Sequence, residues 1–188
     1  LHMSASVGGD IATAQNMDSH KGKTVRLMDD GSVPNDNPFA GGAGTRSAIF
    51  TTGHQNIHGM TLHPETGEIW AISHGDEINI FTAGGNYVWP YTNSGGGTSQ
   101  EYLPMPEGLD LTPAFVGFDP QIRVSGIAFY TGDAFPSWRN NVFVGSMNDQ
   151  HIRRVAYDDT GRIAEEDLFI VPGEQIRDLR MGPDGMLY

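Results

Sequence analysis

A turn followed by a short apolar and aromatic strand recurs along this chain, and this repeat constrains the fold more than any other feature. It occurs in GEIWAIS, NNVFVGS and DGMLY, and the opening LHMSAS matches the strand half. The repeats lie roughly 45 to 75 residues apart, a spacing that suits propeller blades carrying insertions. From LHMSAS to DGMLY we count about three blade-lengths. Closed propellers have about four to eight blades, so we expect this chain to supply part of a ring.

Composition favours an all-β fold. The 188 residues include 25 glycines and 11 prolines, and the sequence shows no long helical period. Such a composition is typical of many short strands joined by turns. A chain of this length also buries enough surface for a packed core. We therefore expect one all-β domain over residues 1–188, a partial β-propeller of about three blades.

The charge of the chain excludes two classes of partner. Its net charge of −12 argues against binding nucleic acid or an anionic membrane surface, because both require a cationic face. No apolar run approaches the roughly 20 residues of a membrane span, and the chain has no cysteine for a disulfide or thiolate site. Its acidic loops could attract calcium, or the charge could serve only solubility.

The most informative stretch is residues 53–90. Met60 and Leu62 alternate with polar residues, a turn follows at residues 65–67, and an apolar run resumes at Ile69, so the pattern predicts a β-hairpin. Two polar clusters flank this hairpin: His54, Gln55, Asn56 and His58 before it, and His74, Gly75, Asp76 and Glu77 after it. A tight hairpin brings its outer ends to one end of a sheet. These clusters are therefore the candidate site.

Simpler interpretations compete at several positions. The Asp29-Asp30 pair is typical of a turn, although both residues could bind metal. His54 and His58 have the spacing of one helix face, but no helix is expected there, so we expect no zinc pair. The three tryptophans, Trp70, Trp89 and Trp138, are expected to pack in the core rather than to bind sugar.

Several ordered motifs resemble a known family. They are AQ followed by SHKGK and DDGS, then GH-x-N-x-x-G, HGDEIN, G-x-N-Y-x-WP, SG-x-AFYTGD-x-FP-x-W and IRD-x-R-x-GPDG-x-LY. In this order they resemble the soluble PQQ-dependent glucose/sorbosone (aldose sugar) dehydrogenases. The resemblance implies a six-bladed β-propeller that binds calcium and pyrroloquinoline quinone (PQQ) at one end of its channel. It also implies a periplasmic or extracellular location and oxidation of a sugar C1 hydroxyl by hydride transfer to the quinone.

The resemblance also implies which residues hold the cofactor. The matching positions are Gln55, Asn56, Asn148, Gln175 and Arg177. The family usually has a cation at three of these positions, where this chain has Gln55, Asn148 and Gln175. Since a charge-assisted hydrogen bond is worth about 1.5–3 kcal/mol, the three replacements predict quinone binding weaker by roughly 4–9 kcal/mol.

The metal positions follow from the same resemblance. Gly75 lies where backbone carbonyls hold the calcium that touches the quinone, although the loop between HG and DE is shorter here. Glu77, together with the backbone of Tyr87, matches a separate structural calcium site. The family's general base is a histidine on a motif upstream of the LHMSAS-like strand, so no catalytic residue is assigned within residues 1–188.

Three hypotheses remain open. The chain could be part of a quinone-dependent sugar oxidoreductase. It could instead be a catalytically silent, calcium-binding propeller module that binds a saccharide or a protein partner. In a third hypothesis, the half-ring pairs with a second copy, and this homodimer closes six blades. Arg177 and Arg180 have an alternative role too, since either could pair with Asp178 or Glu174 rather than bind an anion.

Overall fold

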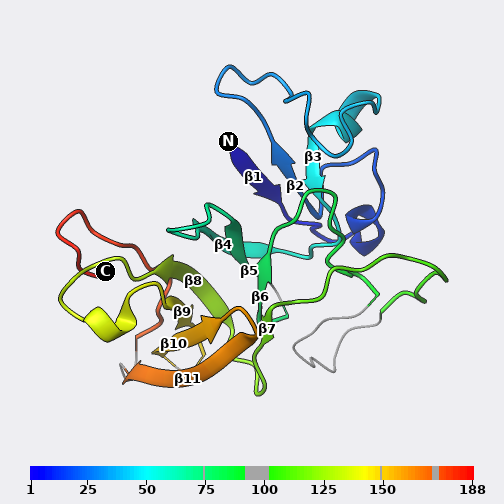
Figure 1. The fold of residues 1–188 in the computed structure, drawn as a ribbon. Coiled ribbons are helices and arrows are strands. Elements are labelled where there is room, and N and C mark those ends of the chain that lie inside the picture. The colour runs from blue at the N-terminus through cyan, green and yellow to red at the C-terminus, as the bar shows by residue number, and fades with distance from the viewer. Residues whose placement is uncertain (74, 92–101, 149, 171–173) are drawn as a thin grey trace.

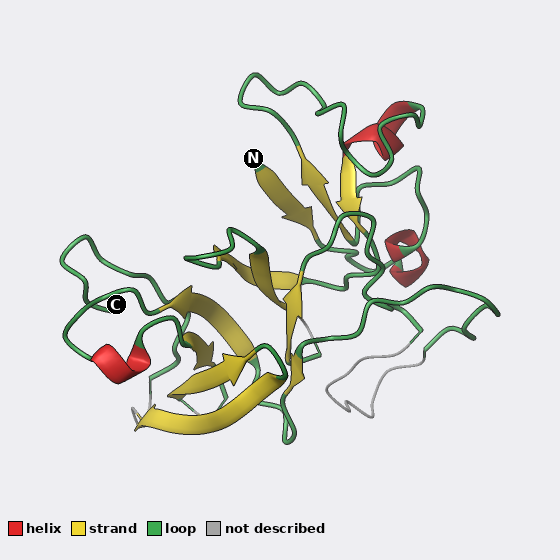
Figure 2. Ribbon diagram, viewed as in Figure 1, coloured by secondary structure: helices red, strands yellow, loops and turns green. Residues whose placement is uncertain are grey.

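The computed structural model describes residues 1–73, 75–91, 102–148, 150–170 and 174–188. His74, assigned above to a polar cluster, lies outside the described residues. The chain folds into three antiparallel sheets that follow one another in sequence order and fan out from the N-terminal to the C-terminal part (Figures 1 and 2). This arrangement agrees with the prediction of an all-β, partial propeller.

Each sheet is a meander, in which strands that follow one another in the sequence pair with each other. The first sheet contains β1 (His2–Ala5), β2 (Lys23–Arg26) and β3 (Ile49–Thr51). The second contains β4 (Ile57–Leu62), β5 (Ile69–Ser73), β6 (Glu77–Ile80) and β7 (Val116–Gly117). The third contains β8 (Val124–Phe129), β9 (Val142–Ser146), β10 (His151–Asp158) and β11 (Gly161–Ile170). Each sheet therefore has the strand order of a propeller blade.

Helical structure in the described ranges is limited to short 3₁₀ turns. These are η1 (Ile11–Ala14), η2 (Gly44–Ala48) and η3 (Pro136–Trp138). η1 lies inside residues 8–20, a stretch of mostly small and polar residues. None of these helices has the length and apolarity needed to span a membrane, within the residues that the structure describes.

The predicted hairpin of residues 53–90 is present as β4 and β5. Its turn is closed by backbone hydrogen bonds from the His63 amide to the Glu68 carbonyl (2.8 Å) and from the Gly67 amide to the His63 carbonyl (2.9 Å). Gly67 has φ +72°, which explains why a glycine stands there. The prediction differs in one detail, since His58 lies within β4 rather than before it.

The main core lies between the second and third sheets. Trp70, Ile72 and Ile78 pack against apolar side chains of β8 and β9, including Ile127 and Val144, all nearly inaccessible to solvent. The intervening residues of β5 and β6 face the other way, toward the first sheet, because side chains alternate along a strand. The second sheet is thus covered on both faces, as an internal propeller blade is.

Close packing of successive inner segments supports a radial arrangement. A Cβ added to Gly59 on β4 would lie 3.2 Å from Ile127 Cγ2 on β8. A Cβ added to Gly126 on β8 would lie 2.6 Å from the Leu179 amide nitrogen. The same relationship therefore joins β4 to β8 and β8 to the segment around Leu179.

The segment after Leu179 begins a further hairpin of the same type. Met181 and Leu187 form an antiparallel bridge, and Arg180 and Tyr188 exchange two backbone hydrogen bonds of 2.8 Å. Gly185, with φ +78°, occupies the turn. The sequence predicted a turn followed by a strand at DGMLY; the structure has the turn, followed by extended backbone that pairs through the isolated Met181–Leu187 bridge.

Candidate functional site

The strand order brings most of the predicted site residues to one end of the sheets. Asn56 precedes β4, Gly75 lies between β5 and β6, Asn148 follows β9, and Gln175 and Arg177 follow β11. In an antiparallel meander, the start of the first strand, the turn between the second and third strands and the end of the fourth strand share one end. We call this end, which includes residues 55–56, 75–76, 121–123, 147–148 and 175–177, the loop surface.

Asp76 joins the second and third sheets at the loop surface. Its carboxylate accepts the backbone N–H of Arg123 through Oδ2 and that of Val124 through Oδ1, both at 2.9 Å. Asp76 is 6% exposed, and both Asp76 (φ +56°) and Arg123 (φ +54°) have left-handed backbone conformations. This contact holds the Arg123 side chain at the loop surface, above the first residue of β8.

Arg123 is a candidate site residue that the sequence analysis missed. Its Nη1 lies 3.4 Å from Asn148 Oδ1, so it pairs with one of the predicted positions. With His58 and Gly75 it lines a small cavity of about 110 Å³. The sequence does contain a signal for Arg123, namely the repeat itself. The segments NIHGM, RVSGI and QIRDL align when Gly59, Gly126 and Asp178 are matched. This alignment puts Asn56, Arg123 and Gln175 at equivalent positions of three successive inner segments.

The C-terminal pair also belongs to the loop surface. Arg177 Nη2 donates to Gln175 Oε1 at 2.7 Å, and both residues are exposed. Arg180 instead forms an ion pair with Asp178 (3.1 Å), as the alternative interpretation expected. The described contacts thus give two pairs, Arg123 with Asn148 and Arg177 with Gln175, in which an arginine can present its remaining N–H groups to an anionic oxygen.

Gln55 and Asn56 lie where the chain passes from the first sheet to the second. The Gln55 carbonyl accepts the Val7 amide at 3.1 Å, and both Gln55 and Asn56 are half-buried. Among the described residues, Asn56 forms no hydrogen bond with either arginine pair. The five predicted positions therefore share one end of the sheets without forming one contiguous network.

His54 is not part of the exposed site. It is buried between the first and second sheets, where its Nε2 lies 2.8 Å from Thr51 Oγ1 and its ring stacks on Tyr87 with centroids 4.9 Å apart. Burial, reinforced by the nearby Lys23 charge, lowers the pKa of His54 to about 3, so the ring is neutral. Among the described residues no group of three or more His, Cys, Asp or Glu side chains could hold a metal ion.

Glu77 belongs to a buried polar cluster on the face of the second sheet that points toward the first. Its Oε1 accepts from Ser73 Oγ and from Asn79 Nδ2, both at 2.9 Å. Asn79 is 1% exposed, and its Oδ1 lacks a hydrogen-bond partner in the part of the chain that the structure describes. A carboxylate beside an orphaned amide oxygen is the kind of donor set that calcium prefers. Glu77 begins β6 rather than lying in the preceding loop.

Tyr87 contributes to the same region through packing and its backbone. Its ring lies in the apolar cluster with Ala71 and Phe81, and its hydroxyl donates to the Ile80 carbonyl at 2.5 Å. The Tyr87 carbonyl accepts the Trp89 amide at 3.0 Å and keeps a second lone pair. Burial raises the pKa of Tyr87, so the hydroxyl remains protonated.

Comparisons with known proteins identify the family. The family model described as Glucose / Sorbosone dehydrogenase matches residues 1–188. The aldose sugar dehydrogenase YliI of Escherichia coli is 39% identical over 186 residues, which is 94% of this chain and 49% of that protein. The quinoprotein glucose dehydrogenase B of Acinetobacter calcoaceticus is 42% identical over 76 residues, 38% of this chain and 15% of that protein.

A solved structure agrees with this result. A crystal structure of a glucose dehydrogenase superimposes with a TM-score of 0.89 at 36% identity, covering all of this chain and 56% of the other. The chain thus spans about half the length of these two broadly matching relatives. On the family match over residues 1–188 and the similarity to YliI, this chain belongs to the glucose/sorbosone dehydrogenase family.

Proposed function

We propose that residues 1–188 form one partial-propeller domain of a sugar dehydrogenase, and that the loop surface supplies part of its cofactor site. The observation that carries the proposal is the pairing of Arg123 with Asn148 and of Arg177 with Gln175 at one end of the sheets. The quinoprotein relative supports a quinone as the cofactor. Its substrate would be an aldose, oxidised at the C1 hydroxyl.

The described residues fit one face of such a quinone and do not enclose it. Arg123 and Arg177 offer guanidinium N–H groups, and Asn56 and Gln175 offer amide N–H groups, which suit carboxylate oxygens. The enclosed space at Arg123 is about 110 Å³, below the roughly 300–1,000 Å³ of small-molecule sites. These side chains are therefore assigned to anion binding only.

Calcium is the second proposed component. Glu77, Asn79 Oδ1 and the Tyr87 carbonyl would hold a structural ion, and the Gly75 carbonyl would face an ion at the loop surface. Asn79 is 1% exposed, and its Oδ1, which lacks a hydrogen-bond partner among the described residues, supports the first site. Gln55 completes the proposed donor set for the quinone, although its amide replaces the family's usual guanidinium.

A silent calcium-binding module that binds a saccharide or a protein partner is the alternative, and the uncharged side chains of Gln55, Asn148 and Gln175 favour it.

Association with a second copy to close the ring is a related proposal. It is supported by exposed apolar side chains at the edge of the first two sheets: Leu1 is 65% exposed, Met3 42% and Leu62 63%. Light scattering that shows a monodisperse monomer would exclude this homodimer.

From the family resemblance we propose a periplasmic or extracellular location.

One titration separates the enzyme from the silent module. Purified protein is titrated with PQQ and calcium, and cofactor absorbance and aldose-dependent dye reduction are followed together. Quinone binding with turnover is the expected result for the enzyme. Calcium binding without a change in quinone absorbance would overturn the proposal in favour of the silent module.

A further inference from the structure

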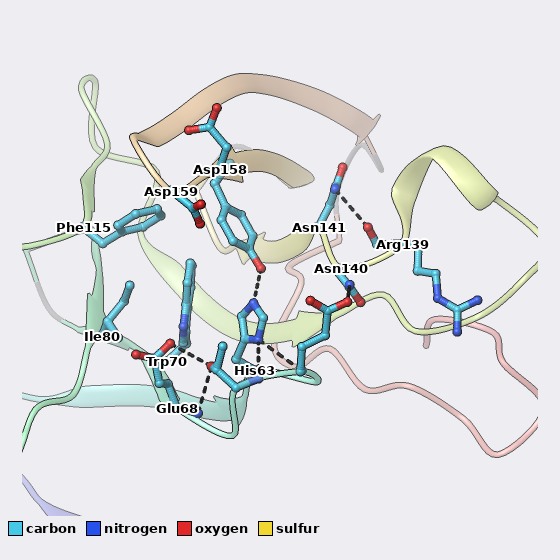
Figure 3. A pocket seen from close by; sticks show the side chains of 13 residues that line it. His63, Glu68, Trp70, Ile80, Phe115, Arg139, Asn140, Asn141, Asp158 and Asp159 are labelled. Carbon is cyan, nitrogen blue, oxygen red and sulfur yellow. Dashed lines mark hydrogen bonds between the residues drawn. The ribbon is translucent and has the colours of Figure 1, made fainter.

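A second cavity lies at the opposite end of the sheets from the loop surface. It has a volume of about 430 Å³ and is formed by three connections: the β4–β5 turn, the residues just before β9, and the β10–β11 turn (Figure 3). It thus lies between the second and third sheets, where β4 ends and β9 begins. Nothing in the proposed quinone chemistry uses this end of the molecule.

One wall of the cavity carries a hydrogen-bond donor whose orientation is fixed by its neighbour. His63 Nδ1 accepts the backbone N–H groups of Glu65 (3.2 Å) and Thr66 (3.1 Å), so the ring proton resides on Nε2. Nε2 then donates to the Tyr157 hydroxyl, 2.6 Å away. Because that oxygen accepts from His63, the Tyr157 proton remains available to a ligand.

The Tyr157 hydroxyl stays protonated over the physiological range. Burial, followed by the charges of Glu65 and Glu68, raises the pKa of Tyr157 to about 12. Trp70 stands in the wall beside His63 and Ile80 and is 2% exposed. Its indole N–H lacks an acceptor among the described residues. The Trp70 nitrogen is itself buried, so the wall combines aromatic surface with one available donor, the Tyr157 hydroxyl.

The rim supplies acceptors. Four carboxylates line the cavity, and Figure 3 shows Asp158 and Asp159 across from Glu68. Some oxygens are already engaged, since Glu68 Oε2 accepts from Thr66 Oγ1 (2.8 Å) and Asp158 Oδ1 accepts from Thr160. Each of these two carboxylates has a second oxygen, and a ligand that fits here must donate to carboxylates as well as accept from Tyr157.

We propose that this cavity is a second saccharide site. A polyhydroxyl ligand both donates to carboxylates and accepts from a phenol, and its C–H face packs on aromatic rings. A metal ion or a polyamine satisfies the carboxylates but offers no acceptor to the Tyr157 hydroxyl. The volume lies within the range of small-molecule sites. This site is independent of the proposed oxidation at the loop surface.

The test uses methyl β-D-glucoside, whose blocked anomeric oxygen makes it unsuitable for C1 oxidation. Binding is measured by calorimetry and by saturation-transfer NMR with the full chain. Loss of one hydrogen bond in Tyr157→Phe, or of a charged acceptor in Asp159→Asn, is expected to raise the Kd about three- to tenfold. Asp159 is exposed on the rim, so Asp159→Asn remains informative if Tyr157→Phe folds poorly. Asn148→Ala, at the other end, is the matched control and should change the Kd by less than about twofold.

Three outcomes would overturn the proposal. The first is no binding of the glucoside, and the second is binding that Asn148→Ala weakens while Asp159→Asn and Tyr157→Phe do not. The third is binding of spermidine or calcium at this cavity without the glucoside, which would make it a cation site. Dye reduction with a free aldose is measured on the same variants. Loss of glucoside binding with dye reduction retained separates this site from the proposed enzyme site.

Discussion

Asp76 and Arg123 lie in different sheets, and the Asp76 carboxylate accepts the Arg123 backbone N–H at 2.9 Å while its other oxygen accepts that of Val124. This contact fixes the start of β8 against the β5–β6 turn. It gives Asp76, which the sequence presented as a member of the candidate site, a structural role. The acid is needed so that Arg123 can lie at the loop surface.

Replacing Asp76 tests this role. Asp76→Ala leaves two backbone N–H groups without their acceptor in a largely buried place, so we expect the free energy of unfolding to fall by about 3 kcal/mol. Urea unfolding measures the change. The control is Asp133→Ala, which removes an exposed ion pair with Arg139 (2.7 Å) and should cost under about 1 kcal/mol. Equal losses in the two variants would contradict the account.

The buried, neutral His54 predicts a loss of stability in acid. Its folded-state pKa is about 3 and its unfolded value is near 6.5, so the unfolded chain binds more protons between these values. Stability is fully present above pH 6.5 and falls with pH, by roughly 2 kcal/mol at pH 5 from this group alone. Urea unfolding at pH 7 and pH 5 measures the difference. His54→Gln should show a smaller pH dependence by about this amount; an unchanged dependence would mean that His54 is not buried as described.

The glycine contacts between inner segments predict a graded series. Gly126→Ala forces a Cβ to within 2.6 Å of backbone at Leu179, so we expect a loss of about 3 kcal/mol. Gly59→Ala meets the Ile127 side chain at 3.2 Å, which can shift, and should cost about 1 kcal/mol. Gly9→Ala has no atom within 4 Å of the added Cβ and is the control. Thermal unfolding that ranks Gly59→Ala as the more damaging of the two would argue against the radial arrangement.

The fold was largely predictable because its repeat consists of local sequence patterns. Turn residues such as Gly67 and Gly185 precede apolar strands of regular length, and these signals do not depend on distant contacts. The strands at GEIWAIS, NNVFVGS and LHMSAS are confirmed as β5, β9 and β1. DGMLY forms the second half of the last hairpin.

The candidate site was less predictable because it depends on contacts between sheets. Nothing near Asp76 in the sequence indicates that its carboxylate binds the amides 47 and 48 residues away. Arg123 was missed because it precedes a strand without any recognisable motif of its own. His54 was grouped with its polar neighbours in the sequence, although its ring is buried against Tyr87. Only an alignment of the inner segments would have shown that Arg123 occupies the position equivalent to Asn56 and Gln175.

Restoring a family cation should strengthen quinone binding. Gln175→Arg places a second guanidinium beside Arg177, and a charge-assisted hydrogen bond of about 1.5–3 kcal/mol corresponds to roughly a 10- to 150-fold lower Kd for PQQ. Absorbance titration in the presence of calcium measures the change. Ser137→Arg, an exposed residue of η3 at the opposite end of the sheets, controls for the added charge alone. An equal effect of the two substitutions would show that Gln175 does not face the quinone.

The central claim is that the loop surface binds the quinone carboxylates, and calorimetric titration of PQQ into the calcium-loaded protein and its Arg123→Gln variant tests it most directly. The account predicts measurable binding that Arg123→Gln weakens about tenfold or more, while Arg139→Gln, at the opposite end, leaves the Kd within about twofold. Absence of binding to the parent protein, or equal affinities for the parent and the Arg123→Gln variant, would contradict the claim.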